Sequence, residues 1–205
     1  MVRLMGRTHL VAGIACSLAC LRPSTPEGCV LAVAGGAVGA VVCDVECHAN
    51  QKNRDVLLTR FILAVILLLV LAADQFFHLH LSDLLITEHA SRAACGLTII
   101  VLTCVRGHFS QHRTFTHSLL FSFLLTLGAW QMTPFLGWSV CLGCLSHLFL
   151  DLLNKKPMQL LYPLRRTFCL RLFYADRTAN RVLMWAGLFA DILLLSWRLS
   201  YIWAA

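Results

Sequence analysis

The chain passes from polar to apolar within the stretch Gln111-His112-Arg113-Thr114-Phe115-Thr116-His117-Ser118-Leu119-Leu120. Two histidines, an arginine and three hydroxyl side chains precede a long apolar run here. Ionisable side chains at membrane depth are costly, so they usually face a bundle interior, a cavity or one another. The stretch therefore predicts both the start of a membrane helix and one half of a polar site.

The composition is that of an integral membrane protein. Of the 205 residues, 59% are hydrophobic and 13% are charged, and the mean hydropathy is +0.74. Soluble domains are about 45–50% apolar and about 25% charged. At roughly 20 residues for each crossing, the length predicts one all-α, polytopic transmembrane bundle of about six or seven spans, with no separate soluble domain.

Apolar runs mark the candidate spans of this single membrane-embedded helical domain, residues 1–205. The runs lie at 10–21, 29–43, 57–73, 93–105, 115–132, 134–153 and 182–204. The first, second and fourth are short for a full crossing. Pro134 with Gly137 predicts a tight turn between the fifth and sixth spans. Small residues allow helices to approach closely, so we expect Gly35, Gly36 and Gly39 to serve helix packing.

Positive charge is distributed unevenly over the predicted loops. If the N-terminus is cytoplasmic, all but three of the 17 Lys and Arg residues fall on the cytoplasmic side, many of them in the basic loop 154–181. The exceptions are Arg22, Arg92 and Arg198. This asymmetry is what the positive-inside rule requires. We therefore interpret the net charge of +7 as a topological signal and expect no direct binding of nucleic acid.

His147 and Asp151 are four residues apart, so on a helix both side chains lie on one face. Imidazole nitrogen and carboxylate oxygen are ordinary ligands of zinc, manganese and iron. The spacing therefore predicts part of a divalent-metal site. The alternative is a hydrogen-bonded pair that braces the helix end.

His112 and His117 are five residues apart and do not share one helical face. If the helix begins near Thr114 to Thr116, with a threonine as N-cap, His112 lies in the preceding loop and can fold back toward His117. Such a loop and helix start could surround an ion. The alternative is a polar loop whose histidines face solvent.

A third candidate segment follows the second span, where Asp44, Glu46 and His48 alternate. An extended segment would direct all three to one side, and a helix would pair Asp44 with His48. The alternative is a solvated helix end. His9, at the start of the first span, completes the set, and the predicted topology brings all four segments to the cytoplasmic membrane face.

Basic residues surround this predicted site. Because the guanidinium fork suits phosphate and carboxylate, an anionic substrate or a membrane-lipid headgroup is a candidate ligand. The alternative is that these residues only fix the topology; Arg113 stands apart because it lies between two candidate metal ligands. The residues concerned are Arg7, Arg113, Lys155, Lys156, Arg165 and Arg166.

Four motifs together resemble those of a known family. The most specific are His-Arg-x-x-Thr-His-Ser, at residues 112–118, and Ser-His-x-x-x-Asp, at residues 146–151. A Thr-His pair stands at residues 8–9, and a Leu-Leu-x-Pro follows at residues 160–163. In these motifs the chain resembles the YdjM-like family of LexA-binding, inner-membrane-associated, metal-dependent hydrolases.

The remaining motif departs from the family pattern. A Pro-Asp-x-Asp-His segment reads Cys43-Asp44-Val45-Glu46-Cys47 here, with His48 one place later, and Asn180 stands near where members carry a glutamate before the last helix. Glutamate, cysteine and histidine can all bind metals. The departures leave the metal and the activity open.

With this resemblance, the leading hypothesis is a hydrolase of the bacterial inner membrane that acts on an ester or phosphoester of an amphiphilic, lipid-like substrate at the cytoplasmic face. Zinc is the first candidate metal, with manganese or iron as alternatives. Glu46 is a candidate ligand or general base, and Arg113 a candidate stabiliser of developing negative charge. The metal ligands are drawn from His9, Asp44, His112, His117, His147 and Asp151.

Two hypotheses from other classes stay open. The chain could be a membrane anchor without enzymatic activity that recruits a cytoplasmic protein partner through the loop 154–181. It could also be a transporter that passes protons or a metal ion. A transporter should carry ionisable groups through the depth of the membrane, whereas here they gather at one face, with Asp191 as the main exception.

Overall fold

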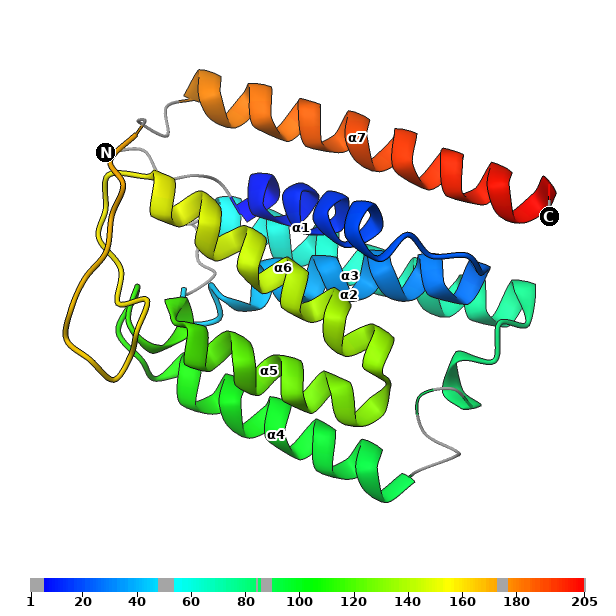
Figure 1. The fold of residues 1–205 in the computed structure, drawn as a ribbon, viewed down its shortest axis with the longest axis horizontal. Coiled ribbons are helices and arrows are strands. Elements are labelled where there is room, and N and C mark those ends of the chain that lie inside the picture. Colours follow the sequence, from blue (N-terminus) through cyan, green and yellow to red (C-terminus); the bar gives the residue numbers. More distant parts are fainter. Residues whose placement is uncertain (1–5, 48–53, 84, 86–89, 173–176, 205) are drawn as a thin grey trace.

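The computed structural model describes residues 6–47, 54–83, 85, 90–172 and 177–204, and every regular element in this part of the chain is helical. The predicted all-α class is confirmed. Figure 1 shows the helices running nearly side by side in one bundle. In chain order the elements are α1 (Gly6–Leu21), α2 (Pro26–Val42), α3 (Arg54–Phe77), α4 (Ala90–His108), the 3-10 turn η3 (Phe115–His117), α5 (Leu119–Met132), α6 (Pro134–Leu153) and α7 (Arg177–Ala204).

The centre of the bundle is the contact of α2 with α6 and α1. These pairs form the most extensive interhelical packing, together with the pairs of α5 with α4 and α6, while α7 packs along α1. Thr25 caps α2 by accepting a hydrogen bond from the Gly28 amide at 3.1 Å, and Pro26 begins the helix. Thr133 caps α6 in the same way before Pro134, which gives the predicted tight turn after α5.

Two faces of α2 are made of small residues, and this allows its neighbours to approach closely. A Cβ atom added at Gly39 would lie 2.3 Å from the carbonyl oxygen of Val140 in α6. A Cβ added at Gly36 would lie 2.6 Å from the carbonyl oxygen of Gly13 in α1. The predicted packing role of these glycines is confirmed, because backbone meets backbone at both positions.

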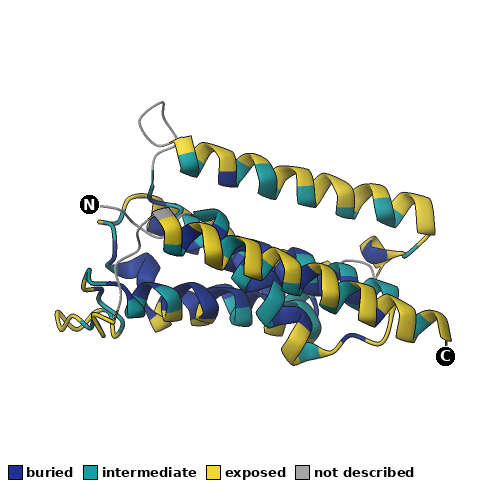
Figure 2. Cartoon of the chain, turned by 90° about the horizontal axis from the view of Figure 1, so that it is seen from above, coloured by how far each residue is buried: buried dark blue, intermediate teal, exposed yellow. Residues whose placement is uncertain are grey.

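The outer helices expose apolar side chains. In α3, whose residues are all described, Thr59 alone is buried, while Phe61, Leu68 and Leu69 are more than half exposed. Figure 2 shows the same pattern along much of α7. By length and composition α3, α4, α6 and α7 are able to cross a membrane, whereas α1, α2 and α5 are shorter apolar helices. Such outer surfaces suit contact with lipid chains.

Six of the seven predicted spans differ from the observed helices by one to five residues at one or both ends. The fifth helix begins at Leu119, not near residue 115, and its N-cap is Ser118 rather than a threonine: the Ser118 hydroxyl accepts from the Phe121 amide at 3.2 Å. The fourth helix has 19 residues because its polar ends continue the helix beyond 93–105. The last helix starts at Arg177, so it takes the final residues of the predicted loop 154–181.

We expect the substitution Gly39→Ala to lower the free energy of unfolding by about 1–3 kcal/mol, the usual cost of overpacking. Its Cβ would press on the Val140 carbonyl, which is backbone and cannot rotate away. Gly28→Ala, in the same helix, is the matched control because its added Cβ would meet nothing nearer than 3.2 Å. Thermal unfolding in detergent compares them, and equal midpoints for the two variants would contradict the packing argument.

Candidate metal centre

Six of the eight predicted site residues are buried, and all eight lie at one end of the bundle. Four separate segments supply them: the first turns of α1, the turn after α2, the segment before α5 and the last turns of α6. Asp44 and His112 retain the most exposure, each with 27% of the side chain accessible. The set consists of His9, Asp44, Glu46, His112, Arg113, His117, His147 and Asp151.

His147 and His117 form the inner part of the cluster, where their Nε2 atoms lie 3.4 Å apart. The Nδ1 atom of His147 lies 2.6 Å from the Ala40 carbonyl oxygen in α2, and since a carbonyl only accepts, Nδ1 carries the proton. The neutral ring then presents a lone pair at Nε2. Fixing a tautomer through the second ring nitrogen is how proteins orient histidine ligands of metals.

Asp151 connects this pair to two further side chains. Its Oδ2 atom lies 3.3 Å from His117 Nε2 and 2.8 Å from a terminal nitrogen of Arg113, and its Oδ1 atom lies 3.7 Å from His9 Nε2. The His9 ring stacks on His147 with centroids 4.0 Å apart. The i, i+4 pair of α6 therefore faces inward, as its spacing predicts.

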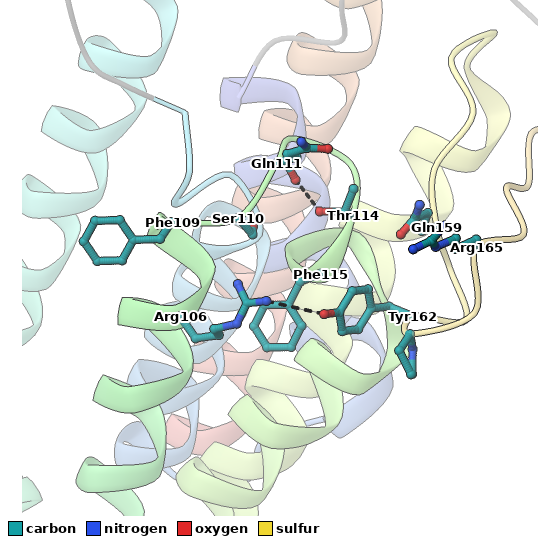
Figure 3. A pocket seen from close by; sticks show the side chains of 10 residues that line it. Arg106, Phe109, Ser110, Gln111, Thr114, Phe115, Gln159, Tyr162 and Arg165 are labelled. Atoms are coloured by element: carbon teal, nitrogen blue, oxygen red, sulfur yellow. Dashed lines mark hydrogen bonds between the residues drawn. The ribbon is translucent and has the colours of Figure 1, made fainter.

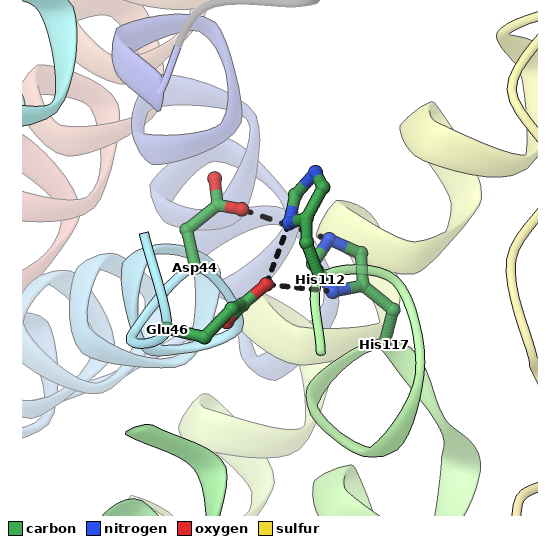
Figure 4. Close-up of side chains that lie close together, drawn as sticks. All are labelled: Asp44, Glu46, His112 and His117. Atoms are coloured by element: carbon green, nitrogen blue, oxygen red, sulfur yellow. Dashed lines mark hydrogen bonds and ion pairs between the residues drawn. The ribbon is translucent and has the colours of Figure 1, made fainter. Parts of the chain in front are cut away.

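The turn after α2 supplies a second group of ligand atoms on the other side of His117 (Figure 4). Asp44 Oδ1 lies 3.6 Å from His117 Nε2. Glu46 Oε1 lies 2.7 Å from His112 Nδ1 and 3.5 Å from His117 Nδ1. The His112 ring folds back to within 5.1 Å of the His117 ring, centroid to centroid, from the loop before η3. His117 thus belongs to both groups.

The donor set fits a divalent cation in two respects. Three buried atoms have no hydrogen-bond partner among the described residues: His9 Nδ1, Glu46 Oε2 and His112 Nε2. The charges of the cluster also favour a cation. When the histidines are neutral, the carboxylates of Asp44, Glu46 and Asp151 carry three negative charges and the Arg113 guanidinium carries one positive charge. The cluster then has a net charge of −2. Burying uncompensated charge is expensive. A divalent cation would balance these charges, and the side chains close enough to share one are Asp44, Glu46, His112 and His117 or His117, His147 and Asp151, so His9 falls outside both groups.

The carboxylates around His117 favour its protonated form. Burial by itself would lower the pKa of this imidazole. The hydrogen bond with Asp151 and the charges of Asp44 and Glu46 outweigh burial, so the pKa of His117 lies above its ordinary value. A metal ligand must be deprotonated, so a cation would displace this proton on binding.

Arg113 is held by backbone as well as by Asp151. One terminal nitrogen donates to the Lys156 carbonyl oxygen at 2.6 Å, and the Arg113 carbonyl accepts from the Gln159 amide at 3.0 Å. Its φ of 64° is uncommon for a residue with a side chain. These contacts keep the guanidinium 2.8 Å from Asp151. They support a role in positioning that carboxylate, and the stabilisation of a developing negative charge stays a prediction.

Several groups around the cluster make contacts that the sequence did not predict. Thr116 Oγ1 lies 3.1 Å from His117 Nδ1, and only its adjacency to His117 could have indicated it. Cys47, which stands at the histidine position of the departing motif, has its Sγ atom 3.6 Å from His112 Nδ1. The Thr8 hydroxyl lies 3.4 Å from Asn180 Oδ1, which joins α7 to the first turns of α1. His48, a candidate from the alternating segment, lies outside the described residues.

The basic residues do not all face the cluster. Arg7 forms an ion pair with Asp55 of α3, with Nε and Oδ1 3.1 Å apart. Arg165 instead lines a pocket of 480 Å³ on the other side of the 111–114 turn (Figure 3). Arg106 lies in the same pocket, 3.4 Å from the Tyr162 hydroxyl. The pocket therefore combines two guanidinium groups with aromatic side chains beside the candidate centre.

Comparisons with known proteins agree with the motifs. A family model described as YdjM inner membrane protein matches residues 4–205. An uncharacterized protein from Bacillus subtilis, YvsG, is 27% identical over 186 residues, which cover 89% of this chain and 88% of that protein. No solved structure matches.

We expect His117→Ala and His147→Ala to remove most of the divalent metal that the protein retains on purification in detergent. Each variant deletes a predicted ligand, so the loss of affinity should exceed the roughly 10- to 100-fold loss that follows changes to outer-shell partners. Elemental analysis of the purified proteins measures this. His78→Ala, at an exposed histidine, is the control, and equal metal content in all three variants would contradict the site.

Proposed function

The chain belongs to the YdjM inner membrane protein family, and from its buried His and carboxylate cluster we propose a metal-dependent hydrolase embedded in the membrane. The substrate would be an ester or phosphoester of an amphiphilic molecule. The observation that carries the proposal is the pair of His117 and His147 Nε2 atoms, 3.4 Å apart beside Asp151, in a site with excess negative charge.

We assign the ligand role to side chains from both groups. His147 would bind through Nε2, since its Nδ1–H is held by Ala40, and Asp151 would bind beside it. The other ligands would come from Asp44, His112 and His117. A divalent cation held there, zinc first and manganese or iron otherwise, would supply Lewis acidity and lower the pKa of water.

Glu46 is the proposed general base. Its Oε1 atom is held by His112 at 2.7 Å, while Oε2 is buried and has no hydrogen-bond partner among the described residues. A carboxylate in this position can accept a proton from water during attack on the substrate. Arg113 would keep Asp151 in place through its 2.8 Å contact, so we assign it a positioning role beside the charge-stabilising role proposed from the sequence.

The pocket beside the centre supports an anionic headgroup as part of the substrate. Arg106 and Arg165 face it together with the Tyr162 hydroxyl, and Gln111 and Thr114 of its lining flank His112 and Arg113. Guanidinium groups bind phosphate through paired hydrogen bonds. A phosphoester headgroup seated there would lie across the 111–114 turn from the candidate centre, with its apolar tail free to contact the exposed helix surfaces.

We propose that the centre faces the cytoplasm, as the distribution of Lys and Arg predicts. Seven crossings would then leave the two ends of the chain on opposite faces. Alkaline phosphatase fused to the C-terminal end should be active and green fluorescent protein fused there should be dark. The reverse result would overturn the proposed orientation.

Hydrolysis assays test the enzymatic proposal. Purified protein is offered a panel of phospholipids and polyprenyl phosphates, and we expect turnover of at least one amphiphile. Glu46→Gln should lower kcat by roughly 100-fold or more, as expected for loss of a general base, and His147→Ala should abolish turnover. Bound metal without turnover of any amphiphile would instead favour a membrane anchor for a cytoplasmic partner, or a transporter.

The same assay tests the headgroup pocket through a matched pair of variants. Arg165→Gln should raise KM about tenfold, which corresponds to one lost charge-assisted hydrogen bond of roughly 1.5 kcal/mol. Arg166→Gln removes the same charge from the next residue, which is exposed and does not line the pocket. An equal change in KM for both variants would show a general charge effect and contradict the assigned pocket.

A further inference from the structure

Arg60 joins α3, a helix that carries none of the predicted site residues, to the turn that bears Asp44 and Glu46. It lies in the second turn of α3 and is half-buried. Its Nη2 atom donates to two backbone carbonyls of the turn, at 2.7 Å to the Cys47 oxygen and at 3.3 Å to the Val45 oxygen. These two acceptors stand on either side of Glu46 in the chain. A residue that the sequence explains by topology alone thus holds part of the candidate centre.

We propose that Arg60 is a positioning residue of the candidate metal centre, and that it fixes the turn after α2 at the distance from the histidines that metal binding needs. The inference rests on the proposed function, because Asp44 and Glu46 are the ligand and the general base assigned there. Arg60 itself would touch neither the metal ion nor the substrate. It acts through the backbone of the turn.

The turn after α2 is held by backbone bonds within it and by donors from other helices. The amides of Asp44, Val45 and Cys47 each donate to the carbonyl three residues earlier, so the end of α2 continues into tight turns. The last carbonyls of a helix lack amide partners within it. Arg60 supplies a donor there, and a cation at this end of a helix also suits the helix dipole. From α4, His108 Nδ1 lies 3.4 Å from the same Val45 oxygen.

Two contacts of the centre depend on the position of this turn. Asp44 Oδ1 lies 3.6 Å from His117 Nε2, and Glu46 Oε1 lies 2.7 Å from His112 Nδ1. Both histidines come from the segment before α5. A backbone shift of about 1 Å in the turn would lengthen the contact of Glu46 with His112 beyond hydrogen-bond range. The same shift would move the Asp44 carboxylate relative to His117.

Arg60 reaches the turn from a fixed base. Nearby on α3, Asp55 accepts a hydrogen bond from the Gly6 amide of α1 at 2.7 Å. Thr59 is the one buried residue of α3, all of whose residues are described, and a Cβ added at Gly6 would lie 2.7 Å from its Oγ1 atom. The first turns of α3 are therefore packed against the start of α1, whereas much of the remaining helix exposes apolar side chains.

Cobalt titration tests the proposal without relying on catalysis. The detergent-purified protein is stripped with a chelator, and Co²⁺ is added while its visible absorption, which reports the ligand geometry, is followed. Arg60→Met removes the charge and both hydrogen bonds. We expect it to weaken Co²⁺ binding roughly 10- to 100-fold, the effect of losing an outer-shell partner, and to change the spectrum. Arg54→Met is the matched control, because Arg54 is an exposed residue of the same helix.

A second variant separates hydrogen bonding from charge. Arg60→Lys keeps the positive charge but carries it on a shorter side chain without the guanidinium fork. We expect its Co²⁺ affinity to lie between those of the wild type and Arg60→Met. Equal affinity in the wild type and Arg60→Lys would show that charge alone is sufficient, and would overturn the hydrogen-bonded role. This comparison holds even if Arg60→Met does not fold.

The outcomes separate the role of Arg60 from the metal centre itself. Absence of Co²⁺ binding by the wild-type protein would overturn the centre. Bound Co²⁺ whose affinity and spectrum are unchanged in Arg60→Met, or changed equally in Arg54→Met, would overturn only the role of Arg60. A lower melting temperature of Arg60→Met with unchanged Co²⁺ binding would assign Arg60 to helix packing alone and would also overturn the proposal.

Discussion

Carboxylates enclosed by apolar helices need positive charge close by, because water is not there to solvate them. Asp44, Glu46 and Asp151 meet at one end of this bundle, and Arg113 balances one of them. Four histidines surround the group, with lone pairs or protons directed into it. A divalent cation at that end would satisfy this charge requirement, and protonation of His117 would satisfy part of it.

The helix packing and the geometry of the centre are coupled through α2. Gly39 lets the backbone of α6 approach, and the carbonyl oxygen of the next residue, Ala40, then accepts the hydrogen bond from His147 Nδ1 at 2.6 Å. The same helix ends in the turn that carries Asp44 and Glu46. A change in the separation of α2 and α6 would therefore alter both the tautomer of His147 and its distance from the carboxylates.

The segment after α6 has a structural role beside its charge. Met158 and Phe168 pair through two backbone hydrogen bonds of 3.0 and 2.8 Å, which folds the segment back on itself. Its backbone then contacts the start of α5 and Arg113: the Leu160 carbonyl accepts from the Leu119 amide at 3.0 Å, and the Lys156 carbonyl accepts from Arg113 at 2.6 Å. The basic loop after α6, which the sequence explains by topology alone, thus also holds the segment that carries Arg113 in place.

The sequence by itself determined the helical class and the inward pairing of His147 with Asp151, because hydropathy and the i, i+4 spacing act within one segment. The same local reasoning placed the start of α5 too early, since apolar Phe115 belongs to a 3-10 turn that Ser118 ends. Only the tertiary structure decided that Arg113 pairs with Asp151, that Glu46 orients His112, and that Cys47 lies 3.6 Å from His112. The physical reason is that these contacts join residues tens of positions apart, and their distances depend on how closely the helices pack.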